Sequence, residues 1–580
     1  MKYLYLIPFL LLYVACNTEP PNAPNVIVIM TDDQGWGDLS YQGNQDLSTP
    51  NIDRIAQEGA IFENFYVSPV CSPTRAEFLT GRYHFRSGVY STSAGGERLN
   101  LGEETIAEVF KKAGYQTALY GKWHSGMQYP YHPNARGFDD FYGFCSGHWG
   151  NYFDPILEHN GEMIKGEGFI IDDLTQQTTN FIQQNKETPF FIYLSLNTPH
   201  SPMQVPDAYW DRFKDKTLVS NQGVSKPLHT RAALAMCENI DDNVGNLLAV
   251  LEENGLDENT IIVYLSDNGP NGRRWNAGMK GTKGTTDEGG TRSPLLIRWK
   301  NTIIPSKVKQ LMGTVDLLPT LSALTGIENK AAKPLDGINL KPSILNSETP
   351  LQSRTLYHYW RGATSLRNQN FRLDKDNNLY HIEKDRNQTE IVNTQYPEDF
   401  QALLTLKEDF LNTASLPTKE KDNRPFPLGH SETNWTQLPA RDALLSGNVQ
   451  RSNRYPNCTF VTNWKSLEDT ISWDTEVLNS GLYEVVLYYT CAEESLGSRI
   501  TLELGENSLE TTLTEGHNPE LVGAAIDRFP RIESYTKDFK PLNMGNIKLE
   551  KGRAKLLLKA NEIKGEKMMD FRMLLLRKKT

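Results

Sequence analysis

The sequence is short of positive charge and contains no internal repeat or low-complexity tract. Its 580 residues carry 60 lysines and arginines against 71 aspartates and glutamates, which gives a formal net charge of -11. Bulk attraction therefore does not favour a nucleic acid or an anionic membrane as partner, and an anionic substrate must be held by a local cluster of cations. A chain of this length is expected to form two globular units preceded by a leader.

Long apolar runs are also rare, and the one that opens the sequence is "MKYLYLIPFLLLYVAC". An early lysine followed by about a dozen apolar residues is typical of a signal-peptide core and too short to span a membrane. Its end, "YVAC", resembles a bacterial lipoprotein box, so we expect a signal at residues 1–16, lipidation of Cys16 and a tether at 17–24. The protein would then be exported and held at the bacterial outer membrane or cell surface only through that lipid. Plain secretion or a periplasmic location is the alternative.

Cysteine is scarce, with six in the chain. Cys145 and Cys237 occur in apolar or helical surroundings and are expected to be inert. Cys458 and Cys491 share the last part of the chain and could form a disulfide in an oxidising compartment, although the sequence does not give their distance. Cys71 differs from these, because a proline and an arginine follow it closely in "SPVCSPTRAEFLTGR".

From residue 25 onward, apolar runs typical of buried strands alternate with amphipathic helices. The runs are "NVIVIM", "QTALY", "PFFIYLSL" and "TIIVYLSD", and the clearest helical patterns lie near 102–115 and 235–255. This alternation predicts an α/β fold, with a mostly parallel central sheet flanked by helices. We place this main domain at 25–415, with a small α+β subdomain made of a hairpin and a helix at 371–413.

The composition changes after residue 415. Residues 416–449 are rich in proline and charge and are interpreted as a linker. Residues 450–580 alternate strand-like runs with turns and have little helical pattern, which predicts an appended all-β sandwich.

A polar cluster follows each of the four strand-like runs of the main domain. These clusters are "TDDQGWGD", "GKWHSG", "NTPHSP" and "DNGPNG". Ligands of open α/β sheets bind at the carboxyl ends of the strands, so the four clusters are expected to converge on one pocket. The clusters include four side chains with hard oxygen donors, which favour calcium or magnesium over zinc: Asp32, Asp33, Asp267 and Asn268. An Asp pair after a strand can also merely cap the next helix.

Cys71 is expected just outside the N-terminus of a helix in which Pro73 occupies the first turn and Arg75 lies one turn in. Such a helix end attracts anions. A thiolate nucleophile of low pKa is one interpretation. A soft thiolate, however, matches a hard-oxygen metal site poorly. We therefore do not expect the thiol itself to be the catalyst.

The segment "CSPTRAEFLTGR" resembles the sulfatase signature, Cys-x-Pro-x-Arg followed by Thr-Gly-Arg. The similarity continues in order from about residue 24 to 415, through "NVIVIMTDDQGWGDLSYQGN", "GYQTALYGKWHSG", "TPHSP", "LSDNG" and "GTKGTTDEGGTRSPLLIRW". The sequence is thus identified as similar to the formylglycine-dependent sulfatases of the alkaline phosphatase superfamily, among them bacterial polysaccharide sulfatases and arylsulfatase-like lipoproteins. The resemblance implies that a formylglycine-generating enzyme, or an equivalent maturase, oxidises Cys71 to formylglycine (3-oxoalanine).

The resemblance also implies a role for each matching residue. One Ca²⁺ would be bound by Asp32, Asp33, Asp267 and Asn268, with formylglycine 71 completing the shell. The residues implied around the reacting group are Arg75, Lys122, His124, His200 and Lys283, with Lys280 a weaker candidate than Lys283. A hydroxyl of the hydrated aldehyde would attack sulfur, and His124 would later take a proton from the second hydroxyl so that sulfate is expelled.

The expected activity is removal of sulfate from a polysaccharide or oligosaccharide during polysaccharide degradation. The glycan could be algal, such as ulvan or carrageenan, or a glycosaminoglycan. "RRW" at 273–275 and "HW" at 148–149 could line a sugar subsite or simply pack. The sandwich would either bind glycan or support the catalytic domain.

Two alternatives stay open. A phosphoester hydrolase of the same superfamily is one, although the histidine-rich pattern of a two-zinc site is missing. A noncatalytic glycan-binding lipoprotein is the other, and it would keep Cys71 unmodified.

Overall fold

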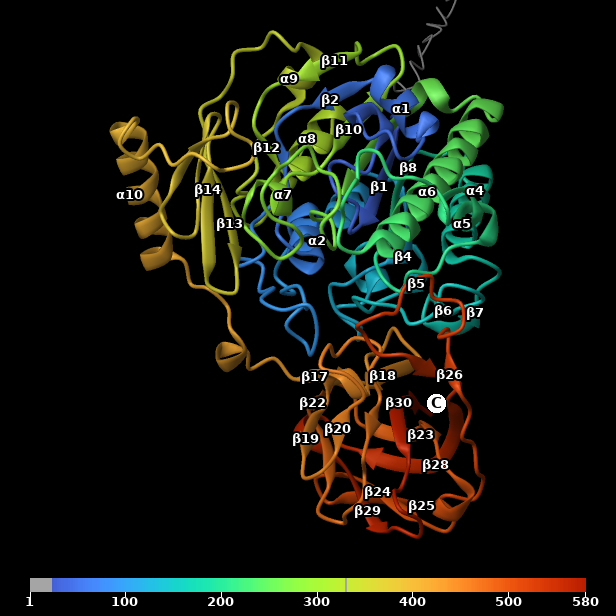
Figure 1. The fold of residues 1–580 in the computed structure, drawn as a ribbon. Helices are drawn as coiled ribbons and strands as arrows, with labels where there is room; N and C mark the ends of the chain where they lie inside the picture. Colours follow the sequence, from blue (N-terminus) through green and yellow to red (C-terminus); the bar gives the residue numbers. More distant parts are fainter. Residues whose placement is uncertain (1–22, 329–330, 580) are drawn as a thin grey trace, which may run out of the picture.

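The computed structural model describes residues 23–328 and 331–579 (Figure 1). The predicted signal at 1–16, its lipidated Cys16 and most of the tether at 17–24 lie outside the described residues. Within the described part, no helix combines the length and the apolar character needed to cross a membrane.

A ten-stranded sheet forms the centre of the main domain, in the order β11-β2-β10-β9-β1-β8-β4-β5-β6-β7. Its middle is parallel and consists of β9 (Thr260–Ser266), β1 (Asn25–Asp32), β8 (Phe190–Pro199), β4 (Gln116–Lys122) and β5 (Asp140–Phe144). Antiparallel pairings at the flanks bring in β10 (Leu295–Trp299), β2 (Ala60–Phe62), β6 (Ile156–His159) and β7 (Glu162–Lys165), while β11 (Ser306–Val308) pairs in parallel with β2. The predicted α/β class is confirmed.

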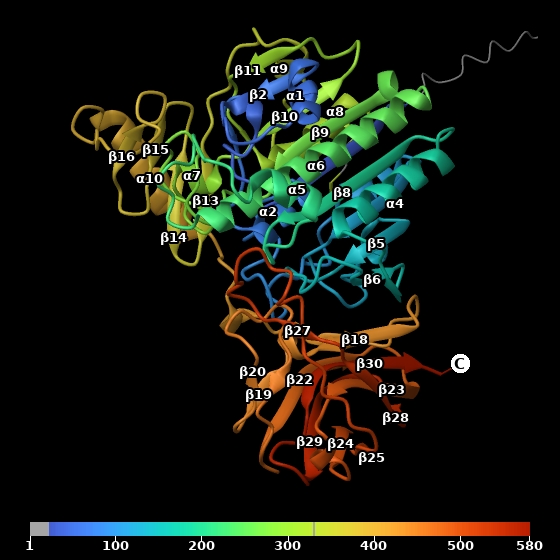
Figure 2. The ribbon, with the colours of Figure 1, turned by 45° about the vertical axis from the view of Figure 1, so that its right-hand side comes forward.

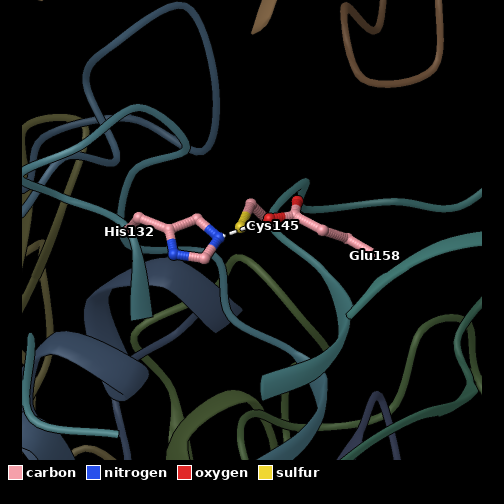
Figure 3. A group of neighbouring side chains, drawn as sticks. All are labelled: His132, Cys145 and Glu158. Atoms are coloured by element: carbon pink, nitrogen blue, oxygen red, sulfur yellow. Dashed lines mark hydrogen bonds and ion pairs between the residues drawn. The ribbon is translucent and has the colours of Figure 1, made fainter. Parts of the chain in front are cut away.

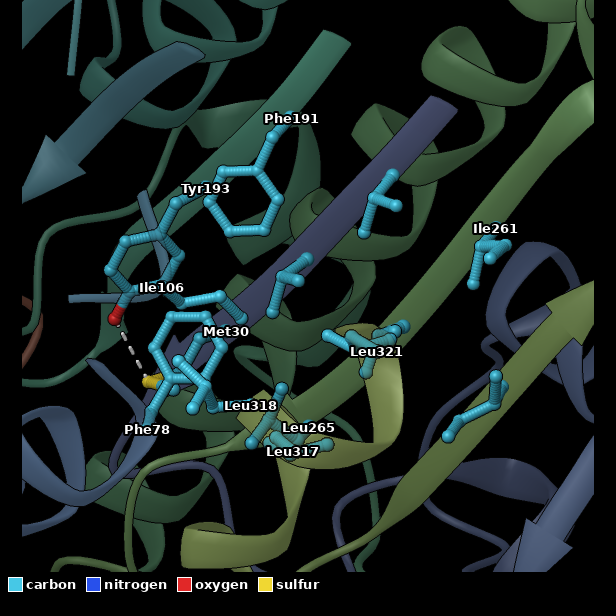
Figure 4. Packing of buried hydrophobic residues seen from close by; sticks show 14 of the residues in the cluster. Met30, Phe78, Ile106, Phe191, Tyr193, Ile261, Leu265, Leu317, Leu318 and Leu321 are labelled. Atoms are coloured by element: carbon cyan, nitrogen blue, oxygen red, sulfur yellow. Dashed lines mark hydrogen bonds between the residues drawn. The ribbon is translucent and has the colours of Figure 1, made fainter. Parts of the chain in front are cut away.

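Both faces of this sheet are covered, which explains why β1, β8 and β9 are buried along their whole length and consist mainly of apolar residues. Successive residues of β1 point to opposite faces. Accordingly Val28 and Met30 belong to one core cluster, and Ile27 and Ile29 to the other. Figure 4 shows the first cluster, where Met30 packs with side chains from other strands and helices.

Helices from distant parts of the chain cover the two faces. The Met30 face is covered by α2 (Cys71–Thr80), α3 (Ile106–Lys112) and α8 (Leu317–Leu324), and the other by α1 (Pro50–Gln57), α4 (Ile170–Gln184) and α6 (Pro227–Glu253). Helix α6 starts eight residues before the predicted boundary at 235, because Pro227 suits a first helical turn and alanines extend the buried face. The shorter helices are α5 (Asp207–Phe213), α7 (Glu288–Thr291) and α9 (Lys341–Leu345), and β3 (Phe65–Tyr66) pairs with β12 (Met312–Gly313).

A small antiparallel sheet with one helix follows the main sheet. It contains β13 (Leu356–Trp360), β14 (Ala363–Arg367), β15 (Phe371–Leu373), β16 (Leu379–His381) and the helix α10 (Pro397–Thr413). The predicted hairpin and helix correspond to β15, β16 and α10. The sequence analysis missed β13 and β14, which are only five residues long; β13 alternates buried and half-buried residues, whereas β14 is buried at four of its five positions.

The C-terminal part is all-β and consists of two main sheets around one core. The first sheet contains β17 (Phe426–Leu428), β19 (Leu444–Ser446), β22 (Thr470–Val477), β24 (Arg499–Leu504), β25 (Asn507–Thr512) and β29 (Gly552–Glu562). The second contains β18 (Trp435–Pro439), β20 (Gln450–Arg451), β21 (Val461–Thr462), β23 (Gly481–Thr490), β28 (Lys540–Leu549) and β30 (Asp570–Lys578). A small ribbon of β26 (Leu521–Val522) and β27 (Thr536–Lys537) lies at the end nearer the main domain (Figure 2).

Two sequence-based expectations for this part need correction. The range 416–449 is not a linker throughout, because β17, β18 and β19 lie within it and pair with strands of the sandwich. The disulfide considered between Cys458 and Cys491 is absent, since both are free thiols. Each thiol instead faces a backbone carbonyl, that of His148 at 2.8 Å from the sulfur of Cys458 and that of Glu515 at 3.6 Å from the sulfur of Cys491.

Candidate active site

The polar clusters meet at the carboxyl ends of the central parallel strands, as strand direction requires. Asp32 ends β1, Lys122 ends β4, His200 directly follows β8 and Asp267 directly follows β9. Helix α2 begins at Cys71 beside them. The residues expected to surround the reaction are all buried except Lys283, whose side chain is 19% exposed. The arrangement therefore brings six separate stretches of chain together in one largely buried cluster.

The acidic residues form an oxygen-rich cluster. Ligand atoms of Asp32, Cys71 and Asp267 all lie within 4.8 Å of one another, and so do those of Asp32, Asp33 and His200. Three buried oxygens have no hydrogen-bond partner within the described chain: Asp32 Oδ1, Asp33 Oδ2 and Asn268 Oδ1. Leaving such atoms unpaired is costly. The donor set fits a hard cation such as calcium or magnesium.

Two lysines contact the same carboxylates. Lys122 Nζ donates to Asp32 Oδ2 at 2.6 Å, and Lys283 Nζ donates to Asp33 Oδ1 at 2.5 Å. Burial is the largest single influence and would raise the pKa of Asp32, but the charges of Lys122, His200, Lys283 and Arg75 together outweigh it and hold that pKa below its ordinary value. Burial lowers the pKa of Lys283, but Asp33 and further anionic groups outweigh it, so the net pKa is raised and this lysine stays cationic.

Asp267 is compensated only in part, by Arg75. Burial and then the charge of Asp32 raise the pKa of Asp267 to about 8, although Arg75 opposes this. A bound cation would relieve the same repulsion, since opposite charge favours the ionised carboxylate.

Helix α2 positions Cys71 and Arg75. The helix begins at Cys71 itself and not after it, because Val70 is the extended cap residue. Arg75 is fully buried and donates from Nη2 to Asp267 Oδ2 at 2.8 Å and from Nη1 to the Lys122 carbonyl at 3.2 Å. Further donation to the hydroxyls of Tyr193 and Ser195 fixes the helix to β8. Arg75 thus holds the start of α2 against three strands.

The geometry of His124 leaves one ring nitrogen free. Its Nε2 lies 2.9 Å from the Thr92 carbonyl, which can only accept, so Nε2 carries the proton. Its Nδ1 is buried and has no hydrogen-bond partner in the described part of the protein. Burial, followed by the charge of Lys122, puts the pKa of His124 well below its ordinary value, which favours the neutral ring.

Gly147 lies against the same ring. A Cβ at Gly147 would stand 2.2 Å from His124 Nε2, which is inside van der Waals contact. The orientation of His124 therefore depends on a glycine at this position.

The β-sandwich contributes to the surroundings of His124, which sequence patterns did not indicate. Asn457 Nδ2 donates to the Thr92 carbonyl at 3.2 Å, so this carbonyl accepts from both Asn457 and His124. Arg441 holds Asn457 through its Oδ1 at 2.7 Å and also donates to Ser146 Oγ at 2.8 Å. The two contacts that cross between the domains join residues 365 and 295 positions apart and have no local motif.

His148 is a second buried histidine that the roles implied by the signature did not include. Its ring centroid lies 5.3 Å from that of His200, and neither of its nitrogens has a hydrogen-bond partner among the described residues. Burial and then the charge of His200 put its pKa well below the ordinary value. His200 Nε2 lies 3.8 Å from Asp33 Oδ2. The two residues of "HW" therefore have different surroundings: His148 lies beside His200, whereas Trp149 stacks on Phe144 with ring centroids 5.0 Å apart.

The structure separates Lys283 from Lys280, and it separates the three residues of "RRW". Lys280 is 3.5 Å from Asp287 and does not contact Asp33. Arg274 is buried against Asp38 at 2.6 Å, whereas Arg273 is exposed. Trp275 packs near Trp36, with ring centroids 6.5 Å apart.

A further cluster of polar residues lies away from this pocket (Figure 3). His132, Cys145 and Glu158 come within 4.8 Å of one another, so Cys145 does not have the purely apolar surroundings expected from the sequence. The backbone N–H of Asn134 donates to His132 Nδ1 at 3.3 Å, which assigns the ring proton to Nε2. This Nε2 then donates to Glu158 at 2.5 Å. This tautomer leaves no lone pair on Nε2 for a metal. The trio is therefore a buried hydrogen-bonded pair with a neighbouring thiol.

Comparison with known proteins adds an independent line of argument. A family model described as Sulfatase matches residues 24–327. The N-acetylgalactosamine-6-sulfatase of Mus musculus is 32% identical over 383 residues, which is 60% of this chain and 70% of that protein. The structure of Ps i-CgsB in complex with k-i-k-neocarrahexaose is 29% identical with a TM-score of 0.63, covering 68% of this chain and 94% of that one.

The fold is also shared by more distant proteins. The structure of BT4656 in complex with D-Glucosamine-2-N, 6-O-disulfate has a TM-score of 0.55 at 23% identity, covering 69% of this chain and 99% of that one. The match to the Sulfatase family model and to the curated relative shows that the chain belongs to the sulfatase family and is a sulfuric ester hydrolase.

Proposed function

We propose that this sulfatase removes sulfate from a sulfated polysaccharide or oligosaccharide, using formylglycine made from Cys71 and one calcium ion. The observation that carries the proposal is the set of unpartnered buried oxygens beside Cys71, with Lys122 and Lys283 on the same cluster. Support for a glycan comes from the relatives, since one is named N-acetylgalactosamine-6-sulfatase and another has a structure in complex with k-i-k-neocarrahexaose. Algal polysaccharides and glycosaminoglycans are therefore the substrate classes to test.

The residues that would hold the cation are Asp32, Asp33, Asp267, Asn268 and residue 71. When bound, calcium would supply positive charge that polarises the sulfate ester. Residue 71, in its hydrated aldehyde form, would supply the attacking oxygen. The first turn of α2 places this residue where backbone N–H groups favour negative charge.

The basic residues divide the remaining work. Lys122 and Lys283 stabilise charge that develops on the sulfuryl oxygens, because each is held in place by a carboxylate. His200 or Lys283 protonates the departing alcohol. His124 receives a proton at its free Nδ1, since its Nε2 proton is committed to the Thr92 carbonyl.

We further propose that the enzyme is exported and anchored by lipid at Cys16, in contact with the membrane through that lipid alone. Its protein partner would be the maturase that oxidises Cys71. Incorporation of labelled fatty acid into the wild type and its absence from Cys16→Ala tests the anchor. Label in both proteins, or in neither, contradicts it.

The proposed chemistry is tested by measuring sulfate release and peptide mass together. Active protein from its native host should contain residues 68–82 in the aldehyde form, and Cys71→Ala should release no sulfate while keeping the wild-type unfolding midpoint. Parallel assays with sulfate and phosphate monoesters separate the sulfatase from a phosphoester hydrolase. An intact thiol in fully active enzyme, or normal turnover by Cys71→Ala, would overturn the formylglycine mechanism.

A further inference from the structure

A pocket of about 300 Å³ lies between the two domains, next to the candidate active site. From the catalytic domain it is lined by Ser201, which directly follows His200, and by Asn271 and Arg273, which follow Asn268. From the sandwich it is lined by residues 529–533. Figure 2 shows the chain near β27 rising from the sandwich toward the catalytic domain. The pocket therefore adjoins the place where the reacting sulfate is expected.

The wall contributed by the sandwich is firmly attached. The Arg528 amide donates to the Met203 carbonyl at 2.8 Å, and Gln204 Nε2 donates to Asp527 Oδ1 at 2.9 Å. Arg531 is buried, pairs with Asp527 at 2.6 Å and donates to the Gly150 carbonyl at 2.6 Å. These contacts fix the segment that carries Phe529 against the catalytic domain.

Two cations of this pocket are uncompensated. Lys226 and Arg273 are exposed, and neither forms a salt bridge or a side-chain hydrogen bond with any described residue. Arg274 and Arg531, by contrast, are neutralised by Asp38 and Asp527. In a chain with a net charge of -11, two free cations at one pocket form a local site for an anion.

The other lining groups suit a sugar. Phe529 offers a half-exposed ring, with Lys226 Nζ 5.7 Å from its centroid and His229 in edge contact at 5.4 Å. Burial, then the charges of Arg274 and Lys226, lower the pKa of His229 to about 4, so the ring is a neutral hydrogen-bonding group. Glu533 is the one carboxylate among the lining residues, and its unpartnered Oε2 can accept from a sugar hydroxyl.

We propose that this interdomain pocket is a subsite for a second anionic group of the glycan, one sugar away from the sulfate that is removed. Lys226 and Arg273 bind that group, which is a sulfate ester or a carboxylate, and Phe529 packs against the sugar ring. The inference rests on the proposed glycan sulfatase function, and it makes the sandwich part of the substrate site. The substrate is therefore a polyanionic oligosaccharide of at least two residues.

The test compares the double variant Lys226→Ala/Arg273→Ala with Lys186→Ala, which removes an exposed lysine remote from the site. The probes are an ι-carrageenan tetrasaccharide, which carries only sulfates, a chondroitin 6-sulfate tetrasaccharide, which also carries carboxylates, and 4-nitrophenyl sulfate. Loss of two partly exposed charge contacts should raise KM for the better tetrasaccharide about tenfold while kcat changes little. Activity on 4-nitrophenyl sulfate should not change in either variant.

A raised KM for the carrageenan tetrasaccharide in the double variant shows that the subsite accepts a sulfate ester. Phe529→Ala should raise KM for the same tetrasaccharide without changing the activity on 4-nitrophenyl sulfate. Equal losses on all three probes would show a structural role, and unchanged KM for both tetrasaccharides would overturn the subsite. Equilibrium binding of the tetrasaccharides to the Cys71→Ala protein separates this inference from the proposed chemistry. If the triple variant Cys71→Ala/Lys226→Ala/Arg273→Ala binds the tetrasaccharides as tightly as Cys71→Ala does, the subsite is refuted, whatever the turnover.

Discussion

Glu77 carries a buried carboxyl group inside the helix that bears Cys71 and Arg75. It is 4% exposed, and it accepts from Ser68 Oγ at 2.9 Å and from the His84 amide at 3.4 Å. Burial raises its pKa to about 8, since the two hydrogen bonds oppose the shift only in part. At neutral pH the folded protein therefore holds this group protonated, whereas the unfolded chain does not.

The magnitude follows from linkage. A carboxyl whose pKa is raised on folding stabilises the native state fully below its unfolded pKa of about 4.3, and the contribution falls as pH rises toward the folded value. The slope is about 1.4 kcal/mol per pH unit while the folded state binds one proton more than the unfolded state. Raising the pH from about 5.5 to about 7.5 should therefore cost about 2.5 kcal/mol through Glu77 alone.

The assay is urea unfolding of the wild type and of Glu77→Gln at both pH values, followed by tryptophan fluorescence. The amide keeps the shape of the side chain and cannot ionise, so the variant should gain about 2.5 kcal/mol on the wild type between the two conditions, in the transition of the catalytic domain. Exposed Glu187→Gln serves as the matched control and should follow the wild type. A stability difference between wild type and Glu77→Gln that is equal at both pH values would refute a buried neutral Glu77.

Three other perturbations give direct outcomes. Gly147→Ala places a methyl group against His124, so kcat should fall at least about tenfold and stability by about 1 to 3 kcal/mol, and wild-type kcat would contradict the described contact. Asn457→Ala removes a donor to the Thr92 carbonyl, so kcat should fall several-fold at constant KM with a changed pH profile, whereas an unaltered profile means that Asn457 does not help to orient His124. Prolonged treatment with EGTA should abolish sulfate release and lower the unfolding midpoint, and added calcium should restore both. Full activity in metal-free buffer, checked by elemental analysis, excludes the proposed ion.

The parts of the fold that the sequence predicts are those whose pattern is local. Strand β1 shows itself because both its faces are buried, and the same holds for β8 and β9. Parallel strands end at the same edge of the sheet, so the sequence alone predicts that Asp32 and Asp267 lie close together. The sequence analysis missed the start of α6, because its proline-led, alanine-rich turn has weak periodicity. It missed β13 and β14 because a strand of five residues is too short to show a clear pattern.

The contacts between domains have no such signal. Asn457 reaches Thr92 across 365 positions, and Arg531 reaches Gly150 across 381. In a single sequence these residues are ordinary polar residues of loops. Of the residues that line the interdomain pocket, the sequence analysis named Arg273 and Arg274, as part of "RRW". The residues of its opposite wall could not be found without the fold.

The wall shared by the two domains affects the order in which the enzyme becomes complete. A ribosome releases the Thr92 and Gly150 carbonyls long before Asn457 and Arg531 exist to donate to them. The catalytic core can collapse early around β1, β4, β8 and β9, but the orientation of His124 receives its last support only when the final quarter of the polypeptide has emerged. Nascent chains and products of premature termination would then have the reactive cluster without its finished surroundings, and full turnover would begin only after synthesis ends.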